Sequence, residues 1–233
     1  MYFVKGLWYN ADMDEALYCY NLFRKKGTMI DVGAWMGTSL LPFVESGWEV
    51  YAFEPDLSNW LELTKRFGGR IYIDNRAVSN KPATNVTLYK SDQASSISSL
   101  APFTDTHYAA IGVDVTTLTD FIKEQNIKKV DFLKIDTEGY DYFVLQGYPW
   151  KKAPKVILCE FEDSKTVPLG YTFKDMAEFL VSKGYDLLVS EWYPIKAYGT
   201  QHQWKRLVPY PCEIDENAWG NIIAIGKNFK NFF

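Results

Sequence analysis

Short β-rich segments alternate with amphipathic stretches along almost the whole chain, and this alternation limits its fold more than any other feature. The segments expected to be strands cover residues 28–33, 49–54, 70–74, 130–136, 155–162, 186–192 and 219–226, with a short extra strand over 84–90. Helix-like stretches separate most of these segments. The pattern predicts an α/β fold with a doubly wound, mostly parallel sheet and helices on both faces.

The last two expected strands, 186–192 and 219–226, have no helix between them. Because parallel neighbours need a long crossover, the final strand is expected to lie antiparallel beside its predecessor. The connecting residues 193–218 are aperiodic and rich in aromatic side chains, which is typical of a binding loop or lid. We expect an inserted aromatic loop there, a candidate substrate lid. A packing flap or a contact in a homodimer is the equal alternative.

The length of 233 residues suits one large α/β domain, so we expect a single domain over 1–233 with an N-terminal helical segment over 1–27. A net charge of −4 and short Lys/Arg runs argue against a broad phosphate-binding surface and against nucleic acid as a partner. The three cysteines are widely spaced, as in a reducing compartment. No signal peptide or membrane span is recognisable. We expect a cytoplasmic protein without stable membrane insertion.

Two glycines follow the first expected strand, in the sequence DVGAWMGTSL. Gly33 can adopt a tight turn, Gly37 lets a helix start close to the strand, and Thr38 or Ser39 can cap that helix. This turn is expected to bind the anionic end of a ligand. Glu54 ends the next strand, 21 residues (54 − 33) after Gly33, where an acidic residue takes the ribose hydroxyls of a cofactor. Ordinary packing is the alternative, but together these features indicate a nucleoside cofactor.

The residue two positions after Gly33 is Trp35. Dinucleotide-binding turns have glycine there, because the pyrophosphate must approach the backbone closely. A cofactor with adenosine but no pyrophosphate avoids this conflict, so S-adenosylmethionine is expected rather than NAD. An NAD-dependent oxidoreductase and a non-catalytic nucleoside-binding module on the same fold are the alternatives.

Charged residues end the buried strand VDFLKID. Lys134 and Asp136 lie on the same face of this strand, so the ammonium can reach the carboxylate, and Glu138 is expected to open the next helix. The strand 155–162 ends with further acids, including Glu160. If the two strands are neighbours, Asp136 and Glu160 converge beside the cofactor cleft, where buried charges need partners, a cation or a polar substrate. The alternative is that these residues only cap a helix and neutralise one another.

Five segments resemble FkbM-type methyltransferases in sequence and in order: MIDVGAWMGTSL (29–40), VYAFEPD (50–56), DNRAVSN (74–80), QASSISSL (93–100) and VDFLKIDTEGYDYFVLQG (130–147). The LKIDTEG block is the most distinctive of them. The resemblance covers about residues 28–162. It implies a Rossmann-like class I methyltransferase fold and S-adenosylmethionine-dependent O-methylation, often of a sugar hydroxyl on a glycan, glycolipid or natural product.

The resemblance also implies which residues contact the cofactor. From the methionine part through the ribose to the adenine edge, these are Asp31, Gly33, Ala34, Glu54, Asn75 and Ala77. The chain departs from the family at Trp35, where Asn is usual, and at Asp141, where Glu is common. The family often has a histidine after the fifth strand, whereas this chain reads EFEDSK, so no histidine base is expected.

Methyl transfer to a sugar hydroxyl requires an aligned acceptor and a group that accepts its proton. We expect Asp136 or Glu160 to accept this proton, while Lys134 holds Asp136 ionised. A divalent metal held by the same carboxylates is the alternative, but no histidine-rich spacing supports it and none is expected. The expected partner is a small-molecule or glycan acceptor.

Overall fold

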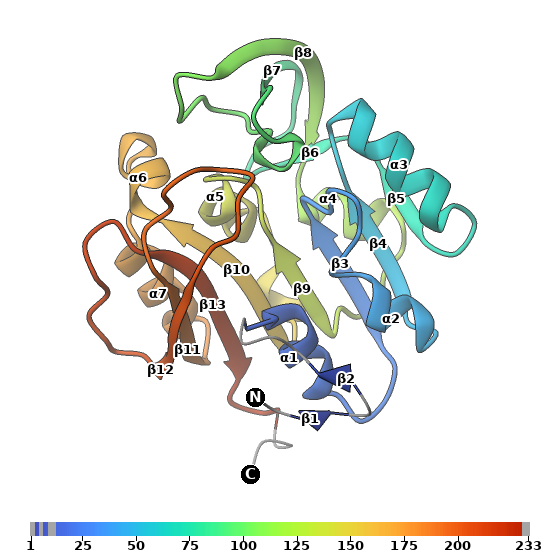
Figure 1. The fold of residues 1–233 in the computed structure, drawn as a ribbon. Coiled ribbons are helices and arrows are strands. Elements are labelled where there is room, and N and C mark those ends of the chain that lie inside the picture. Colours follow the sequence, from blue (N-terminus) through green and yellow to red (C-terminus); the bar gives the residue numbers. More distant parts are fainter. Residues whose placement is uncertain (1–2, 5–6, 9–12, 230–233) are drawn as a thin grey trace.

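The computed structural model describes residues 3–4, 7–8 and 13–229, and an eight-stranded sheet forms its centre (Figure 1). In spatial order the strands are β12 (Trp204–Pro209), β11 (Tyr185–Trp192), β13 (Trp219–Gly226), β10 (Val156–Glu162), β9 (Phe132–Ile135), β3 (Thr28–Val32), β4 (Glu49–Phe53) and β5 (Tyr72–Asp74). The five strands from β10 to β5 are parallel. The last strand, β13, lies antiparallel between β10 and β11, which confirms the predicted reversal beside its predecessor.

Helices cover both faces of this sheet. On one face pack α1 (Glu15–Asn21), α2 (Leu41–Glu45) and α3 (Leu57–Phe67). On the other pack α4 (Leu118–Glu124), α5 (Asp141–Gln146) and α7 (Phe173–Ser182). Successive residues of β10 alternate between the two cores: Val156 and Leu158 contact the first, Ile157 and Cys159 the second. The doubly wound prediction is therefore correct.

A second sheet lies above the carboxyl ends of the parallel strands (Figure 1). Its order is β6 (Ala77–Val78), β8 (His107–Thr116) and β7 (Ala83–Ser91). Strand β7 matches the predicted extra strand, and β8 pairs with it in the antiparallel direction. The short helices α6 (Asp163–Thr166), η1 (Ser95–Ile97), η2 (Trp150–Lys152) and η3 (Val167–Leu169) lie in connections, and β1 (Phe3–Val4) pairs with β2 (Leu7–Trp8).

Three local predictions were wrong. The segment 193–218 contains β12, which pairs with β11 at the edge of the sheet. Helix α2 begins at Leu41, not near Gly37, and no side chain caps it. Glu138 does not open a helix: it and Gly139 have φ values of +55° and +102°, and α5 begins at Asp141. Two tight turns thus replace the expected first turns of helix after β3 and β9.

Cys19, Cys159 and Cys212 are all free thiols. Within the residues that the structure describes, no helix is long and apolar enough to cross a membrane.

Candidate active site at the carboxyl ends of the strands

A cleft opens between the carboxyl ends of β3, β4 and β9 and the small sheet above them. It encloses about 540 Å³ of atom-free space, part of which is open to solvent. This is where the strand order of an open α/β sheet reverses and ligands bind. Its apolar walls come from Val32, Phe53, Val78, Leu88, Leu100 and Tyr140. Its polar lining includes Glu54, Asn59, Ser95, Ser99, Asp136 and Thr137.

Glu54, at the end of β4, places a buried carboxylate in the cleft wall. Its Oε2 accepts a hydrogen bond from the backbone N–H of Trp35 at 2.8 Å, and its Oε1 accepts one from that of Asp56 at 2.9 Å. Burial raises the pKa of Glu54 to about 7, although these two hydrogen bonds act in the opposite direction. The side chain therefore exchanges its proton near neutral pH and has lone pairs left for hydroxyl donors in the cleft.

Trp35 connects the turn after β3 to the segment that closes the cleft. Its backbone has φ +47°, in the left-handed region, and the hydrogen bond to Glu54 holds it there. The indole Nε1 donates to Ser95 Oγ at 3.0 Å, and Asn59 Nδ2 donates to the backbone oxygen of Ser95 at 2.9 Å. The indole thus forms part of the cleft wall.

Gly33 allows the turn after β3 to pass very close to the end of β9. Its φ is +82°, and a Cβ atom there would lie 1.8 Å from the backbone oxygen of Asp136. No side chain fits this contact. The glycine therefore fixes the relative position of the two strand ends that carry the site.

Replacing Gly33 by alanine should lower the free energy of unfolding by roughly 2–5 kcal/mol, because it adds left-handed strain and a backbone clash. Gly69→Ala is a matched control, since Gly69 has φ +78° and nothing lies within 4 Å of its added Cβ. It should cost only the roughly 1–2 kcal/mol of backbone strain. Urea unfolding of both variants measures the difference, and equal losses would show that the contact with Asp136 is unimportant.

The predicted cofactor residues divide into two groups. Gly33, Glu54 and Ala77 border the cleft. The remaining ones do not line it, and they are Asp31, Ala34, Gly37, Thr38 and Asn75. Thr38 and Asn75 are exposed, and Asp31 is completely buried. Their roles stay predictions.

Asp31 instead anchors the interior of the site. Ser39 Oγ, which was expected to cap a helix, donates to Asp31 Oδ2 at 2.7 Å. Lys134 Nζ lies 3.3 Å from Asp31 Oδ1 and 3.2 Å from Asp136 Oδ2, which confirms the predicted pairing of Lys134 with Asp136. Burial raises the pKa of Asp31, and Lys134 and Ser39 counteract it. Burial lowers the pKa of Lys134, but the two carboxylates outweigh burial and leave it above its usual value, so Lys134 is a cation.

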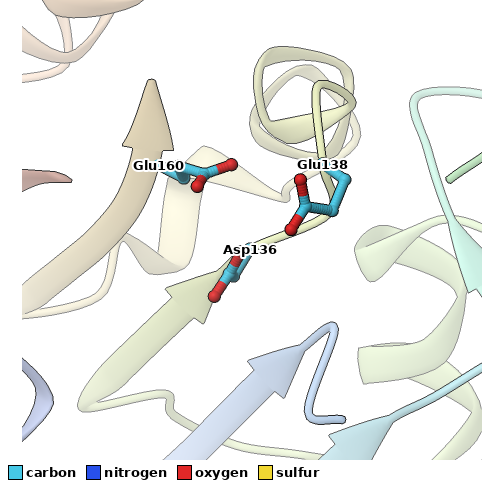
Figure 2. Close-up of side chains that lie close together, drawn as sticks. All are labelled: Asp136, Glu138 and Glu160. Carbon is cyan, nitrogen blue, oxygen red and sulfur yellow. The ribbon is translucent and has the colours of Figure 1, made fainter. Parts of the chain in front are cut away.

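Three carboxylates converge beside the cleft, as Figure 2 shows. Strands β9 and β10 are parallel neighbours, and carboxylate oxygens of Asp136, Glu138 and Glu160 lie within 4.8 Å of one another. The predicted meeting of Asp136 and Glu160 is thus observed. Glu138 joins them because its left-handed backbone turns the side chain back toward the strands, and Ser99 Oγ donates to its backbone oxygen at 2.8 Å.

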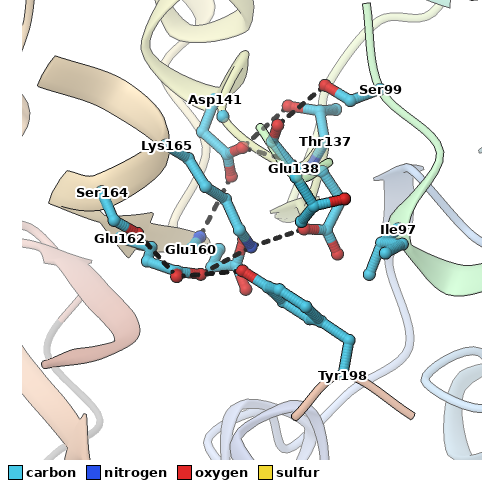
Figure 3. Close-up of polar contacts among 12 residues, drawn as sticks. Ile97, Ser99, Thr137, Glu138, Asp141, Glu160, Glu162, Ser164, Lys165 and Tyr198 are labelled. Atoms are coloured by element: carbon cyan, nitrogen blue, oxygen red, sulfur yellow. Dashed lines mark hydrogen bonds and ion pairs between the residues drawn. The ribbon is translucent and has the colours of Figure 1, made fainter. Parts of the chain in front are cut away.

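A lysine that was not predicted from the sequence neutralises part of this cluster. Lys165 comes from α6, and its side chain is 2% exposed. Its Nζ lies 2.5 Å from Glu138, 3.2 Å from Glu160 and 2.8 Å from Glu162 (Figure 3). Burial raises the pKa of Glu138 to about 7 and that of Glu160 well above its usual value, even though Lys165 opposes both shifts. Glu138 and Glu160 therefore hold their protons more tightly than exposed carboxyl groups do.

Two further side chains complete the cluster (Figure 3). Asp141 accepts hydrogen bonds from the backbone N–H and Oγ1 of Thr137 and from the backbone N–H of Glu160, which ties the end of β9 to β10. Burial raises the pKa of Asp141 to about 6. Tyr198, from the segment 193–218, donates its hydroxyl to Glu162 Oε1 at 3.1 Å. The aromatic segment thus reaches the acidic cluster.

The same three carboxylates, Asp136, Glu138 and Glu160, are spaced closely enough to bind a divalent cation. However, the ammonium group of Lys165 already contacts two of them. A metal ion at this position would face a buried positive charge. In this structure the ammonium group of Lys165 supplies the positive charge next to these carboxylates.

Among solved structures, the fold is similar to several methyltransferases. One is precorrin-6y C5,15-methyltransferase from Geobacter metallireducens, with 11% identity, a TM-score of 0.48, and coverage of 91% of this chain and 85% of that one. Another is a TehB-like SAM-dependent methyltransferase from Corynebacterium glutamicum, with 11% identity, a TM-score of 0.43, and coverage of 91% and 87%. A third is TrmK from M. capricolum with S-adenosyl-homocysteine, with 13% identity, a TM-score of 0.45, and coverage of 92% and 68%.

Comparison with curated proteins gives no match. The sequence model of the methyltransferase FkbM domain, in contrast, matches residues 31–187, which is about two thirds of the chain and includes the cleft residues, the acidic cluster and Lys165. The chain therefore belongs to the FkbM methyltransferase domain family and is an S-adenosylmethionine-dependent methyltransferase.

Proposed function

We propose that this methyltransferase transfers its methyl group to a hydroxyl of a sugar, a glycan or a related small molecule. The observation that carries the proposal is the convergence of Asp136, Glu138 and Glu160 next to the cleft. A hydroxyl is a poor nucleophile until its proton is accepted, and a carboxylate beside the reacting oxygen can accept it. Family membership also excludes the NAD-dependent oxidoreductase considered from the sequence.

The cleft has the chemistry that a nucleoside with a charged amino-acid end requires. Its apolar walls suit an adenine ring, and the buried carboxylate of Glu54 is an acceptor suited to ribose hydroxyls. Gly33, Glu54 and Ala77 would hold S-adenosylmethionine there. When bound, the cofactor supplies the electrophilic methyl carbon. The residues of the chain must orient the acceptor, exclude water and take up one proton.

A second hollow, of about 690 Å³ of atom-free space, borders the same group of acids. Glu138, Lys165 and Phe103 line it, whereas Asp136 lines the cofactor cleft. An acceptor in this hollow would therefore present a hydroxyl between the two carboxylates. Phe103 lies against Tyr198, with ring centroids 5.7 Å apart, and these rings offer flat faces for a sugar.

Within this arrangement we propose that Asp136 is the base that accepts the proton of the acceptor hydroxyl, because Asp136 borders the cofactor cleft. Lys134 positions Asp136 by the ion pair at 3.2 Å. Glu160 is the alternative base, but it is held by Lys165 and lies deeper, with 9% of its surface exposed. Segment 193–218 acts as the lid that excludes water, through the contact of Tyr198 with Glu162.

Labelling tests the acceptor class. The purified protein is incubated with methyl-labelled cofactor and separate cell fractions of glycans, glycolipids, small molecules and RNA. Label recovered as a methyl ether on a sugar or related small molecule supports the proposal. Label found in RNA alone would contradict the acceptor class, and calorimetric binding of S-adenosylhomocysteine checks the cofactor site independently.

Replacing Glu54 by glutamine should weaken S-adenosylhomocysteine binding by about 10- to 100-fold at pH 8, which corresponds to a lost hydrogen bond to a charged group. The ionised carboxylate is the better acceptor for ribose hydroxyls, and the pKa of Glu54 is about 7. Affinity of the unmodified protein should therefore rise from pH 6 to pH 8, and the variant should lose this rise. Calorimetry at both pH values measures it, with the exposed Glu62→Gln as control. Unchanged affinity would remove Glu54 from the cofactor site.

A further inference from the structure

Basic side chains gather at the edge of the sheet opposite the cleft. A hollow of about 800 Å³ of atom-free space there is lined by five of them, namely Arg24, Lys25, Lys26, Lys129 and Lys155. They come from the connections before β3, β9 and β10. These three strands are parallel neighbours, so their amino ends meet at one edge, the lower one in Figure 1.

The positive charge at this edge is largely unbalanced. One carboxylate lines the hollow, that of Asp131, and its Oδ1 already pairs with Lys129 at 2.9 Å and Lys155 at 2.8 Å. Five cations against one carboxylate leave four positive charges in a chain whose net charge is −4. Within the part of the chain that the structure describes, Arg24, Lys25 and Lys26 make no ion pair. Exposed cations with no partner attract anions from solution.

The basic surface extends beyond the hollow. Lys128, Lys151 and Lys152 are exposed on the connections that carry Lys129 and Lys155, and Lys152 Nζ donates to the backbone oxygen of Ile127 at 3.4 Å. The sequence showed these residues only as separate runs of two or three. The fold brings these runs together at one edge of the sheet.

Aromatic rings accompany these charges. Phe23 and Phe229 both line the hollow and are half-buried, with ring centroids 5.2 Å apart, and Lys155 Nζ lies 5.7 Å from the centre of the Phe229 ring. Basic residues mixed with aromatic ones are characteristic of protein surfaces that lie in the headgroup layer of a bilayer.

We propose that this basic edge, formed by Arg24, Lys25, Lys26, Lys129 and Lys155, docks the protein on the surface of a bilayer that contains anionic phospholipids. A free phosphate would engage only the hollow, whereas the exposed side chains of Lys128, Lys151 and Lys152 extend the positive charge beyond it. An RNA strand that extended from this edge to the reaction site would meet the carboxylates of Glu138, Glu160 and Glu162 there. Docking in this way leaves the cleft, at the opposite ends of the strands, facing the aqueous phase.

The test is cosedimentation of the full chain with sucrose-loaded vesicles of phosphatidylcholine, with and without 30% (about one third) phosphatidylserine. Binding is expected only with phosphatidylserine and should decline as salt rises from about 0.1 to 0.5 M, because screening weakens it. Each basic residue near such a surface contributes roughly fivefold in affinity. The triple variant Arg24→Gln, Lys25→Gln, Lys26→Gln should therefore bind roughly 100-fold more weakly.

A triple variant of equal charge change, Lys65→Gln, Lys81→Gln, Lys174→Gln, is the control, because these exposed lysines lie on other parts of the surface. It should bind like the unmodified protein. Equal losses in both triple variants, or equal binding to vesicles without phosphatidylserine, would overturn the proposal. Tight binding of an RNA of about 20 nucleotides without vesicle binding would also overturn it. So would displacement of the protein from vesicles by millimolar inorganic phosphate.

Discussion

Replacing Lys165 by methionine is expected to lower the free energy of unfolding by about 3–5 kcal/mol at pH 8. The side chain of Lys165 is 2% exposed, and its ammonium contacts Glu138, Glu160 and Glu162, whose side chains are 11%, 10% and 8% exposed. Methionine has a similar length but no charge, so it leaves three buried carboxylates without their shared cation. Urea unfolding at pH 8 and pH 5 measures the effect.

The loss should be smaller at pH 5 than at pH 8. A carboxyl whose pKa is raised by folding favours the folded state only while protonated, so its contribution falls as pH rises from its unfolded pKa to its folded pKa. Burial already raises the pKa of Glu138 to about 7 and that of Glu160 further. Removing Lys165 raises the pKa values of Glu138 and Glu160 further. The pH range over which their contribution to stability falls then extends above pH 7. The pKa of Lys165 itself is above its usual value, so its charge is constant between pH 5 and 8.

Two comparisons make this test specific. Lys65→Met breaks the exposed pair with Glu62 and should change stability by no more than about 1 kcal/mol. The double variant Lys165→Met, Glu138→Gln removes one of the orphaned charges and should recover part of the loss. If Lys165→Met were as stable as Lys65→Met at pH 8, the acidic cluster would be protonated or solvated, and Lys165 would not be its counter-ion.

The strands and the reversal of the last one could be predicted from the sequence because each depends on a local pattern, whereas the spatial order of the strands was not predicted. Strand β10 alternates between two cores, and helix α7 has the capping box of Thr172 and Asp175 that its sequence indicates. The reversal of β13 followed from the missing helix before it. The buried face of α3 is not the one that an apolar pattern with Leu57 and Leu61 indicates: both leucines are exposed, whereas Asn59 is buried and its amide binds Ser95 in the cleft wall. Tertiary contacts there override the apolar pattern.

The part of the candidate site that lies at the carboxyl ends of the strands could be predicted from the sequence. Lys134, Asp136 and Glu160 meet because β9 and β10 are parallel and in register. Lys165 was missed because α6 has four residues, too short for a periodic signal. Tyr198 was noted only as one of several aromatic residues, and its contact with Glu162 depends on how the segment 193–218 folds back.

The basic edge could not be predicted from the sequence for a similar reason. Composition predicts the net charge of a surface but not its distribution, since Arg24, Lys129 and Lys155 are far apart in the sequence and adjacent in the fold. The amino and carboxyl ends of the parallel strands therefore carry opposite charge: cations at one end, and the acids around Asp136 at the other.

Replacing Asp136 by asparagine is expected to reduce methyl transfer by about 10²–10⁴-fold in kcat/KM, the contribution typical of a general base. Asparagine has the same shape but cannot accept the proton of the acceptor hydroxyl. The fold should survive, because the Asp136 side chain is 39% exposed and Lys134 keeps its contact with Asp31. Unfolding and S-adenosylhomocysteine binding should thus change little, and transfer of labelled methyl to the acceptor fraction measures the activity.

The control is Asp114→Asn, which removes an exposed carboxylate on β8 and should leave activity unchanged. Glu160→Gln, compared in parallel, distinguishes the two candidate bases, since the larger loss identifies the carboxylate that takes the proton. A rate that rises with pH in the unmodified protein but not in Asp136→Asn would link the loss to proton transfer. Undiminished methylation by Asp136→Asn would remove this residue from the chemistry, and a loss of S-adenosylhomocysteine binding would assign it to cofactor positioning instead.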